Sequence, residues 1–306
     1  SEFACKITKL FLPLQIILEN NYQKQYFMKE LLTRTLFGAI YAGVVIGSIL
    51  VDACLFGIVF MVVTALAVKE YHKLVQNSVK QTAYAMAASV LLFAFVFFSY
   101  NGVSWSYPLL FGYVVVMILS MLQEVIRPNN QTLSHWGHLC SSQLMIALPF
   151  SLMTAVLMED KFLLLALFIL VWANDSGAYL LGSLTARSKN GNHKMCPAIS
   201  PKKSWEGLVG GIILSVAAVC VFQVVGWTSS ITLTAYPWLN SILLALVVSI
   251  FSTLGDLMES QMKRTLGVKD SGKFMPGHGG VLDRFDSLLL VTPVVYFLFL
   301  YLPTMF

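Results

Sequence analysis

Apolar residues in this chain come in long runs, without the period of two or 3.6 residues that half-buried strands and helices show. Runs of about 17 to 25 apolar residues are long enough to cross a bilayer as helices. Asp52 alone separates the first two runs, which must form either a tight hairpin or one broken segment. The pattern predicts an all-α, polytopic integral membrane protein with about nine transmembrane helices. These are expected over residues 35–51, 53–68, 82–99, 106–122, 140–157, 162–181, 207–226, 239–256 and 287–303.

The basic residues support this topology, because they fall almost entirely on one side of it. With nine spans, Lys161 is the single exception among the 20 Lys and Arg residues. Cytoplasmic loops of membrane proteins collect Lys and Arg. We therefore expect a bacterial inner-membrane protein whose N-terminus and basic loops face the cytoplasm.

Composition agrees with a membrane protein. Charged residues make up 11% of the chain and hydrophobic residues 57%, whereas soluble domains carry about 25% charged residues. The net charge of +5 belongs to the basic side, where anionic lipid headgroups would attract it, and no nucleic-acid partner is expected. The 5 cysteines are scattered without a C-x-x-C pair, so neither a zinc site nor a disulfide framework is indicated.

Spans one to five are almost free of ionisable residues, whereas two long polar loops follow later in the chain, which predicts a scaffold followed by a catalytic region. Residues 1–27 read either as a segment added for expression or as an interfacial helix. Residues 28–160 are predicted to be a transmembrane scaffold, and residues 161–306 the catalytic region. His135 and His138 fall in a predicted loop of the scaffold, for which a solvated loop is favoured over a metal site.

The segment G-D-L-M-E-S-Q-M-K-R places polar residues at the end of an apolar span. Asp256, Ser260 and either Lys263 or Arg264 are spaced to share one helical face. A carboxylate at a membrane boundary costs free energy unless it is paired, hydrated or metal-bound. The face therefore indicates a functional site, with a simple ion pair that closes the helix as the alternative.

The next segment, P-G-H-G-G-V-L-D-R-F-D, combines a glycine turn with two acids. Gly279 and Gly280 let backbone N–H groups approach a ligand around His278, which suits phosphate oxygens. Asp283 and Asp286 follow at a spacing of three, as expected for carboxylates that hold Mg²⁺ against substrate phosphates. A capped and charged start to the last span is the alternative.

A second polar loop contains S-P-K-K-S-W-E-G. Ser200 before Pro201 predicts a helix N-cap and first helical position. This would place free N–H groups, which bind anions, beside Lys202 and Lys203. Upstream, Asp175 lies at the end of span six. An ordinary basic loop beside the membrane is the alternative.

These motifs together resemble a known signature. S-Q-M-K-R, K-D-S-G and P-G-H-G-G-V-L-D-R-F-D, in that order, are similar to the signature of the phosphatidate cytidylyltransferase (CDP-diacylglycerol synthase) family. D-S-G-A-Y and S-P-K-K-S-W-E-G resemble its second conserved region, so the resemblance covers most of residues 172–287. It implies a membrane enzyme that joins CTP to phosphatidic acid and yields CDP-diacylglycerol and pyrophosphate with Mg²⁺.

The resemblance also implies roles for individual residues. Asp256 and Asp283 match the metal centre, which is expected to hold Mg²⁺ and to accommodate a monovalent ion such as K⁺. The residues expected to act in catalysis are Asp256, Asp283, Lys263, Arg264 and Asp286. Those expected to contact substrate are Asp175, Ser200, Lys202, Lys203, Ser260, Lys269, Asp270, His278, Gly279, Gly280 and Arg284.

Two other functions use similar residues. A CTP-dependent polyprenol kinase would transfer the γ-phosphoryl group and release CDP rather than pyrophosphate. A secondary transporter could place acids at broken helix ends, but it would not consume CTP. The expected partners are CTP, phosphatidic acid and membrane lipids; a homodimer is compatible with such an enzyme, although the sequence indicates no interface.

Overall fold

The computed structural model describes residues 32–126, 130–188, 191–231, 233–272, 274 and 279–305. Within these residues, 9 helical segments are long and apolar enough to span a membrane, which confirms the predicted all-α polytopic fold. They are Leu32–Val51, α2 (Ala53–Leu74), α3 (Val79–Tyr100), α4 (Tyr107–Ile126), α5 (Thr132–Ser142) joined to α6 (Leu148–Glu159), α7 (Lys161–Ala186), α8 (Trp205–Val225), α9 (Pro237–Thr265) and α10 (Leu282–Val295). Residues 1–27 lie outside this part of the chain, so the expectation for them stays a prediction.

Short irregular helices complete several spans. A 3₁₀ turn, Ser104–Ser106, leads into α4. The π-helical segment Gln143–Ala147 joins α5 to α6, and Tyr296–Tyr301 continues α10 as a second π-helical segment before the 3₁₀ turn Leu302–Met305. The fifth and ninth spans are therefore continuous crossings despite their changes of helix type.

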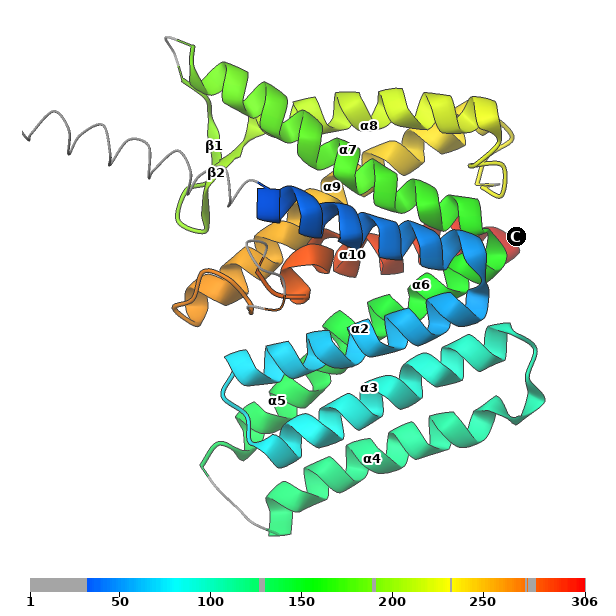
Figure 1. Cartoon of the computed structure of the whole chain (residues 1–306), viewed down its shortest axis with the longest axis vertical. Coiled ribbons are helices and arrows are strands. Elements are labelled where there is room, and N and C mark those ends of the chain that lie inside the picture. The colour runs from blue at the N-terminus through cyan, green and yellow to red at the C-terminus, as the bar shows by residue number, and fades with distance from the viewer. Residues whose placement is uncertain are drawn as a thin grey trace, which may run out of the picture.

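Side-chain caps define where the helices turn. Asp52 has extended backbone dihedrals, and its carboxylate accepts a hydrogen bond from the Cys54 amide at 2.8 Å. It ends the first helix and caps α2, so the two runs form a hairpin rather than one broken span (Figure 1). Asp160 caps α7 in the same way through the Phe162 amide at 2.8 Å.

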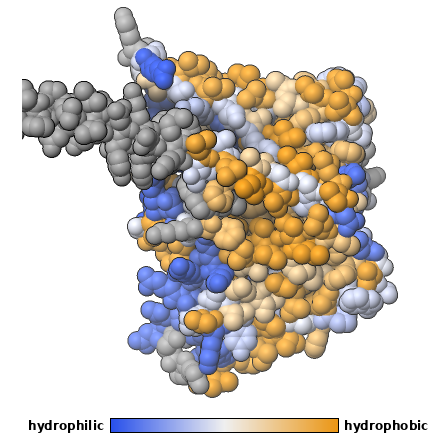
Figure 2. Space-filling model, viewed as in Figure 1, coloured by the Kyte–Doolittle hydropathy of each residue, from blue (hydrophilic) through white to orange (hydrophobic). Residues whose placement is uncertain are grey.

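The helices alternate in direction, and their connections separate into two ends (Figure 1). One end carries the 75–78 turn, the β hairpin and the segment between α9 and α10; the other carries Asp160 and the C-terminus. Figure 2 shows a broad apolar surface bordered by hydrophilic residues at the first end. We name this the polar end, and α7, whose first residue is Lys161, begins at the opposite one.

A cluster of phenylalanines packs the N-terminal helices against α10. Phe60 of α2 contacts Phe150 of α6, Phe168 of α7 and Phe285 of α10, with ring centroids 5.8–6.2 Å apart. All four rings are at most 3% exposed. Residues from both sides of position 160 therefore share one core, and Phe285 anchors the turn of α10 that carries Asp283 and Asp286.

The structure corrects the interpretation of Ser200. Ser200–Ser204 forms β2, which pairs antiparallel with β1 (Lys194–Cys196), and α8 begins only at Trp205. The N-cap is Ser204, whose hydroxyl accepts from the Gly207 amide at 3.1 Å. The prediction placed the cap one hairpin strand too early, because Pro is also tolerated in the exposed strand of a two-stranded ribbon.

The two scaffold histidines lie on α5 rather than in a loop, which is a second correction. His135 contacts Glu124 at 3.0 Å, and His138 contacts Asn77 at 3.2 Å. The N-cap position is Gln131, whose side chain makes no capping hydrogen bond, so no cap marks the start of this helix.

Candidate active site

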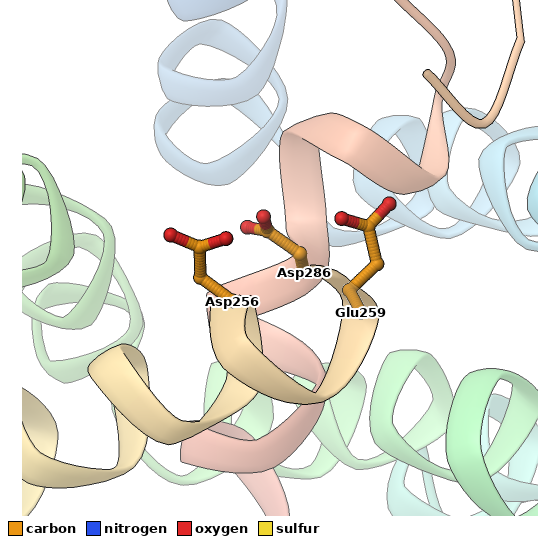
Figure 3. Close-up of side chains that lie close together, drawn as sticks. All are labelled: Asp256, Glu259 and Asp286. Atoms are coloured by element: carbon orange, nitrogen blue, oxygen red, sulfur yellow. The ribbon is translucent and has the colours of Figure 1, made fainter. Parts of the chain in front are cut away.

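Three carboxylates meet at the polar end, between α9 and α10. One oxygen from each of Asp256, Glu259 and Asp286 lies within 4.8 Å of the others. Figure 3 shows Asp256 and Asp286 side by side, with Glu259 beyond Asp286 on the same side of α9. We call these three residues the acid cluster. Like charges so close repel each other strongly unless cations or protons compensate them.

A glycine brings the two helices together at this point. A Cβ atom on Gly255 would lie 2.7 Å from the Asp286 carbonyl oxygen, closer than a methyl group can approach. Gly255 precedes Asp256 directly, so the close contact between backbones places Asp256 opposite Asp286. Glu259 shares their face because it lies three residues after Asp256 on a continuous helix.

Two lysines flank the acid cluster. The Lys203 ammonium lies 2.7 Å from Asp256 Oδ2 and donates to the Thr253 carbonyl at 3.2 Å. Lys263, one helical turn beyond Glu259, forms an ion pair with Glu259 and lies 2.8 Å from Asp283 Oδ1. The Glu259 side chain is only 3% exposed, and Asp283 is 7% exposed. The lysines therefore offset part of the negative charge that burial makes costly.

Asp283 has partners other than the acid cluster. Besides Lys263, its carboxylate accepts hydrogen bonds from the Gly280 amide at 2.7 Å and from the Ser271 amide at 2.9 Å. Gly279 has a φ of +85°, and a Cβ there would lie 2.5 Å from Asp283 Oδ2. Gly279 and Gly280 thus pack against this aspartate, whereas Asp256 groups with Glu259 and Asp286. The assignment of Asp256 and Asp283 to one cation stays a prediction.

A cavity of about 280 Å³ opens beside Asp256. Its polar lining includes Asp175 of α7 together with Lys202 and Lys203 of β2. The hairpin therefore brings the predicted basic pair to Asp256, a contact that spans 53 positions of the sequence. Ser200 opens β2 and does not line this cavity.

Two further pairs of predicted site residues lie in different places. Ser260 donates to Asp256 Oδ1 at 3.2 Å, and Arg264 donates to the carbonyl oxygens of Ile199 and Val268 at 3.3 and 3.4 Å. Lys269 and Asp270 lie on a separate cavity of about 780 Å³ between α2 and the 268–281 segment.

Arg284 and His278 complete the predicted set. The Arg284 Nε atom is buried and has no hydrogen-bond partner among the described residues, so it can still donate to a ligand. The prediction for His278 falls outside the described residues.

Sequence reasoning missed two acids of this region. Glu259 carried a signal, since its spacing of three from Asp256 places both on one face of a helix. Glu70 of α2 carried none: its carboxylate reaches Ser271 and Leu282, more than 200 positions away. Only the folded chain brings them together.

Comparison with known proteins identifies the family. Residues 32–302 match the model of the cytidylyltransferase family. The phosphatidate cytidylyltransferase of Bacillus subtilis is 35% identical over 205 residues, which is 66% of this chain and 71% of the relative. The Rickettsia felis protein of the same name is 36% identical over 202 residues, 64% of this chain and 84% of the relative.

A shorter match is more similar. The phosphatidate cytidylyltransferase of Haemophilus influenzae is 46% identical over 139 residues, 45% of this chain and 46% of the relative. The family match includes the acid cluster, the two flanking lysines and the two glycines that pack against Asp283. The chain belongs to the cytidylyltransferase family.

Proposed function

We propose that this protein is a phosphatidate cytidylyltransferase, which transfers CMP from CTP to phosphatidic acid and releases pyrophosphate. The acid cluster between two lysines, at the polar end of the bundle, is the observation that carries the proposal. One substrate is dissolved in water and the other is held by its acyl chains. A site at this boundary can receive both.

The main obstacle to the reaction is electrostatic. A phosphate monoester has a second pKa of about 6 and is largely dianionic at neutral pH. Its oxygen can attack the α-phosphorus of CTP without a general base. As the new bond forms, the bond between the α-phosphorus and the oxygen that bridges it to the β-phosphorus breaks. Two anions must approach and a third must leave, so catalysis depends on positioning and charge neutralisation.

The basic side chains are placed for that neutralisation. Lys202 and Lys203 line the cavity beside Asp256, where they can receive the phosphatidate headgroup. Arg284 contributes a buried Nε donor without a protein partner. Lys263 stands between Glu259 and Asp283, where it can stabilise negative charge that develops on the transferring group. The acyl chains would remain among the apolar helices.

The acid cluster fits a divalent cation. Glu259 Oε1 is buried without a hydrogen-bond partner among the described residues, so this oxygen is available to a ligand. Mg²⁺ prefers carboxylate oxygens at about 2.1 Å, which allows ligand separations up to about 4.2 Å, close to the 4.8 Å of the cluster. Asp256, Glu259 and Asp286 would hold the ion.

When bound, Mg²⁺ would neutralise CTP phosphate oxygens and orient the pyrophosphate leaving group. Asp283, which the family resemblance implies as a ligand, is already held by Lys263 and two amides, so its participation is a separate proposal. A K⁺ ion beside Mg²⁺ is part of the same proposal.

The orientation and assembly follow from the same reasoning. Because the basic residues gather at the polar end, we place this end at the cytoplasmic face of a bacterial inner membrane. CTP and Mg²⁺ are supplied there. We also propose that the protein forms a homodimer, which size-exclusion chromatography with light scattering tests.

The activity is tested with purified full-length protein, CTP and phosphatidic acid, with and without Mg²⁺. We expect CDP-diacylglycerol and pyrophosphate in equal amounts, and no product without a divalent cation. Release of CDP on addition of a polyprenol would instead identify the kinase. CTP left unconsumed with every acceptor, together with solute uptake in proteoliposomes, would identify a transporter.

A further inference from the structure

Glu70 reaches the catalytic segment from the N-terminal half of the chain. It lies on the last turn of α2, and its Oε2 atom accepts two hydrogen bonds. The donors are the Leu282 amide at 2.8 Å and the Ser271 hydroxyl at 3.1 Å. One carboxylate oxygen thus ties α2 to both ends of the segment that joins α9 to α10.

Two glycines make room for this carboxylate. A Cβ atom on either Gly272 or Gly280 would overlap Glu70 Oε1. Gly272 follows α9 in the chain, and Gly280 precedes α10. Because neither position carries a side chain, the backbone at Gly272 and at Gly280 can pack directly against the Glu70 carboxylate.

The same segment holds Asp283. The Ser271 amide donates to Asp283 while the Ser271 hydroxyl donates to Glu70. The Gly280 amide donates to Asp283 as well, and Leu282 is the first residue of α10. Two carboxylates from opposite halves of the chain therefore share Ser271 as a donor and hold the backbone at the start of α10.

The physical reason for a carboxylate here is the start of α10. The first amides of a helix have no partner within the helix, and a negative charge near them is stabilising. Glu70 gives the Leu282 amide a hydrogen-bond acceptor and places a negative charge beside the start of α10. A second contact from the N-terminal half, the Tyr41 hydroxyl donating to the Arg284 carbonyl at 3.3 Å, supports the start of α10.

We propose that Glu70 is a positioning residue for CMP transfer: it holds Ser271 and Leu282 and thereby the placement of Asp283, Lys263 and Asp286. The proposal rests on the proposed function, but it also makes a structural prediction that does not. Without the Glu70 carboxylate, Ser271 and Leu282 should be held less firmly, and Lys269, which is exposed, should become easier to cleave.

The test uses the full chain in detergent with Glu70→Ala and Glu70→Gln. Misplacement of catalytic groups by about 1 Å can cost roughly 100-fold in rate, so we expect kcat of Glu70→Ala to fall about 100-fold while KM for CTP changes less than about threefold. Tryptic cleavage after Lys269 should accelerate about tenfold. Glu70→Gln keeps an acceptor oxygen, and we expect it to retain kcat within about fivefold.

Two further variants complete the experiment. Gly272→Ala displaces the Glu70 carboxylate without removing it and should reproduce the kinetic defect, which covers the case in which Glu70→Ala does not fold. Glu124→Gln removes another buried carboxylate charge, away from Ser271 and Leu282, and should leave kcat and cleavage unchanged. Wild-type kcat and wild-type cleavage in both Glu70→Ala and Gly272→Ala would overturn the proposal. If wild-type protein transferred no CMP, the proposed function would fail while the cleavage comparison still tested Glu70.

Discussion

Two groups of buried polar side chains lie at the polar end, and they differ in how their charge is satisfied. In the first, Glu124 of α4 uses both carboxylate oxygens within the protein: Gln81 contacts one at 2.5 Å and His135 the other at 3.0 Å. In the second, the acid cluster gathers three carboxylates within 4.8 Å and leaves Glu259 Oε1 buried without a partner among the described residues.

The comparison separates a structural network from a site prepared for a ligand. A network in which each carboxylate oxygen has a partner holds helices together and needs nothing from solution. Carboxylates that lie close together without enough hydrogen-bond donors repel one another, and a bound cation removes this repulsion. We therefore expect substitutions in the acid cluster to affect turnover and substitutions around Glu124 to affect stability.

The largest effect is expected for Asp286→Asn. It removes one negative charge from the acid cluster with little change in shape, and kcat should fall about 1,000-fold or more. The thermal midpoint should stay the same or rise, because like-charge repulsion decreases. Steady-state kinetics and thermal unfolding measure these two quantities. An Asp286→Asn enzyme with wild-type kcat would show that the acid cluster is not a ligand site needed for turnover.

Asp283→Asn distinguishes two roles for Asp283, one as a metal ligand and one as a partner that positions Lys263 and the Gly280 backbone. If Asp283 acts through Lys263 and the Gly280 backbone, kcat should fall about 100-fold while the Mg²⁺ concentration for half-maximal rate stays unchanged. A ligand role predicts a clear increase in that concentration. Magnesium titrations of the wild type and this variant decide between the two, and full activity would exclude both roles.

A smaller effect is expected for Lys203→Ala. Loss of the ammonium beside Asp256 should lower kcat/KM for phosphatidic acid about tenfold, with less change in KM for CTP. Lys161→Ala is the matched control, because that lysine begins α7, which starts at the opposite end of the bundle. The reverse pattern, with KM for CTP rising more, would assign Lys203 to the nucleotide.

The smallest effect on activity is expected for Glu124→Gln. The neutral side chain weakens the contact with His135, and the free energy of unfolding should fall by about 1–2 kcal/mol. Turnover at a temperature where the protein is folded should not change. Chemical denaturation and an activity assay on the same sample check this, and a loss of kcat without loss of stability would contradict it.

Much of the architecture was predictable because bilayer thickness sets the length of a span. All nine expected spans overlap the helical segments of the structure, and the helical spacing of the segment around Asp256 placed its polar face correctly. These are local properties: run length, spacing and capping residues.

The features that the sequence did not predict depend on contacts between residues far apart in the chain. The β hairpin was missed because Ser200 and Pro201 also suit a helix start, and only pairing with Lys194–Cys196 makes the strand. The grouping of Asp286 with Asp256 depends on the close approach at Gly255. Glu70 is brought to Ser271 and Leu282 by the Phe60–Phe285 core rather than by any motif.

Manganese binding tests the central claim most directly, because it reports on the acid cluster without requiring turnover. Mn²⁺ can replace Mg²⁺ at oxygen ligands, and electron paramagnetic resonance measures its binding to purified wild type, Asp286→Asn and Glu124→Gln. We predict one bound Mn²⁺ per chain in the wild type and in Glu124→Gln, and at least about tenfold weaker binding in Asp286→Asn. Equal Mn²⁺ affinity in Asp286→Asn and the wild type would contradict the account.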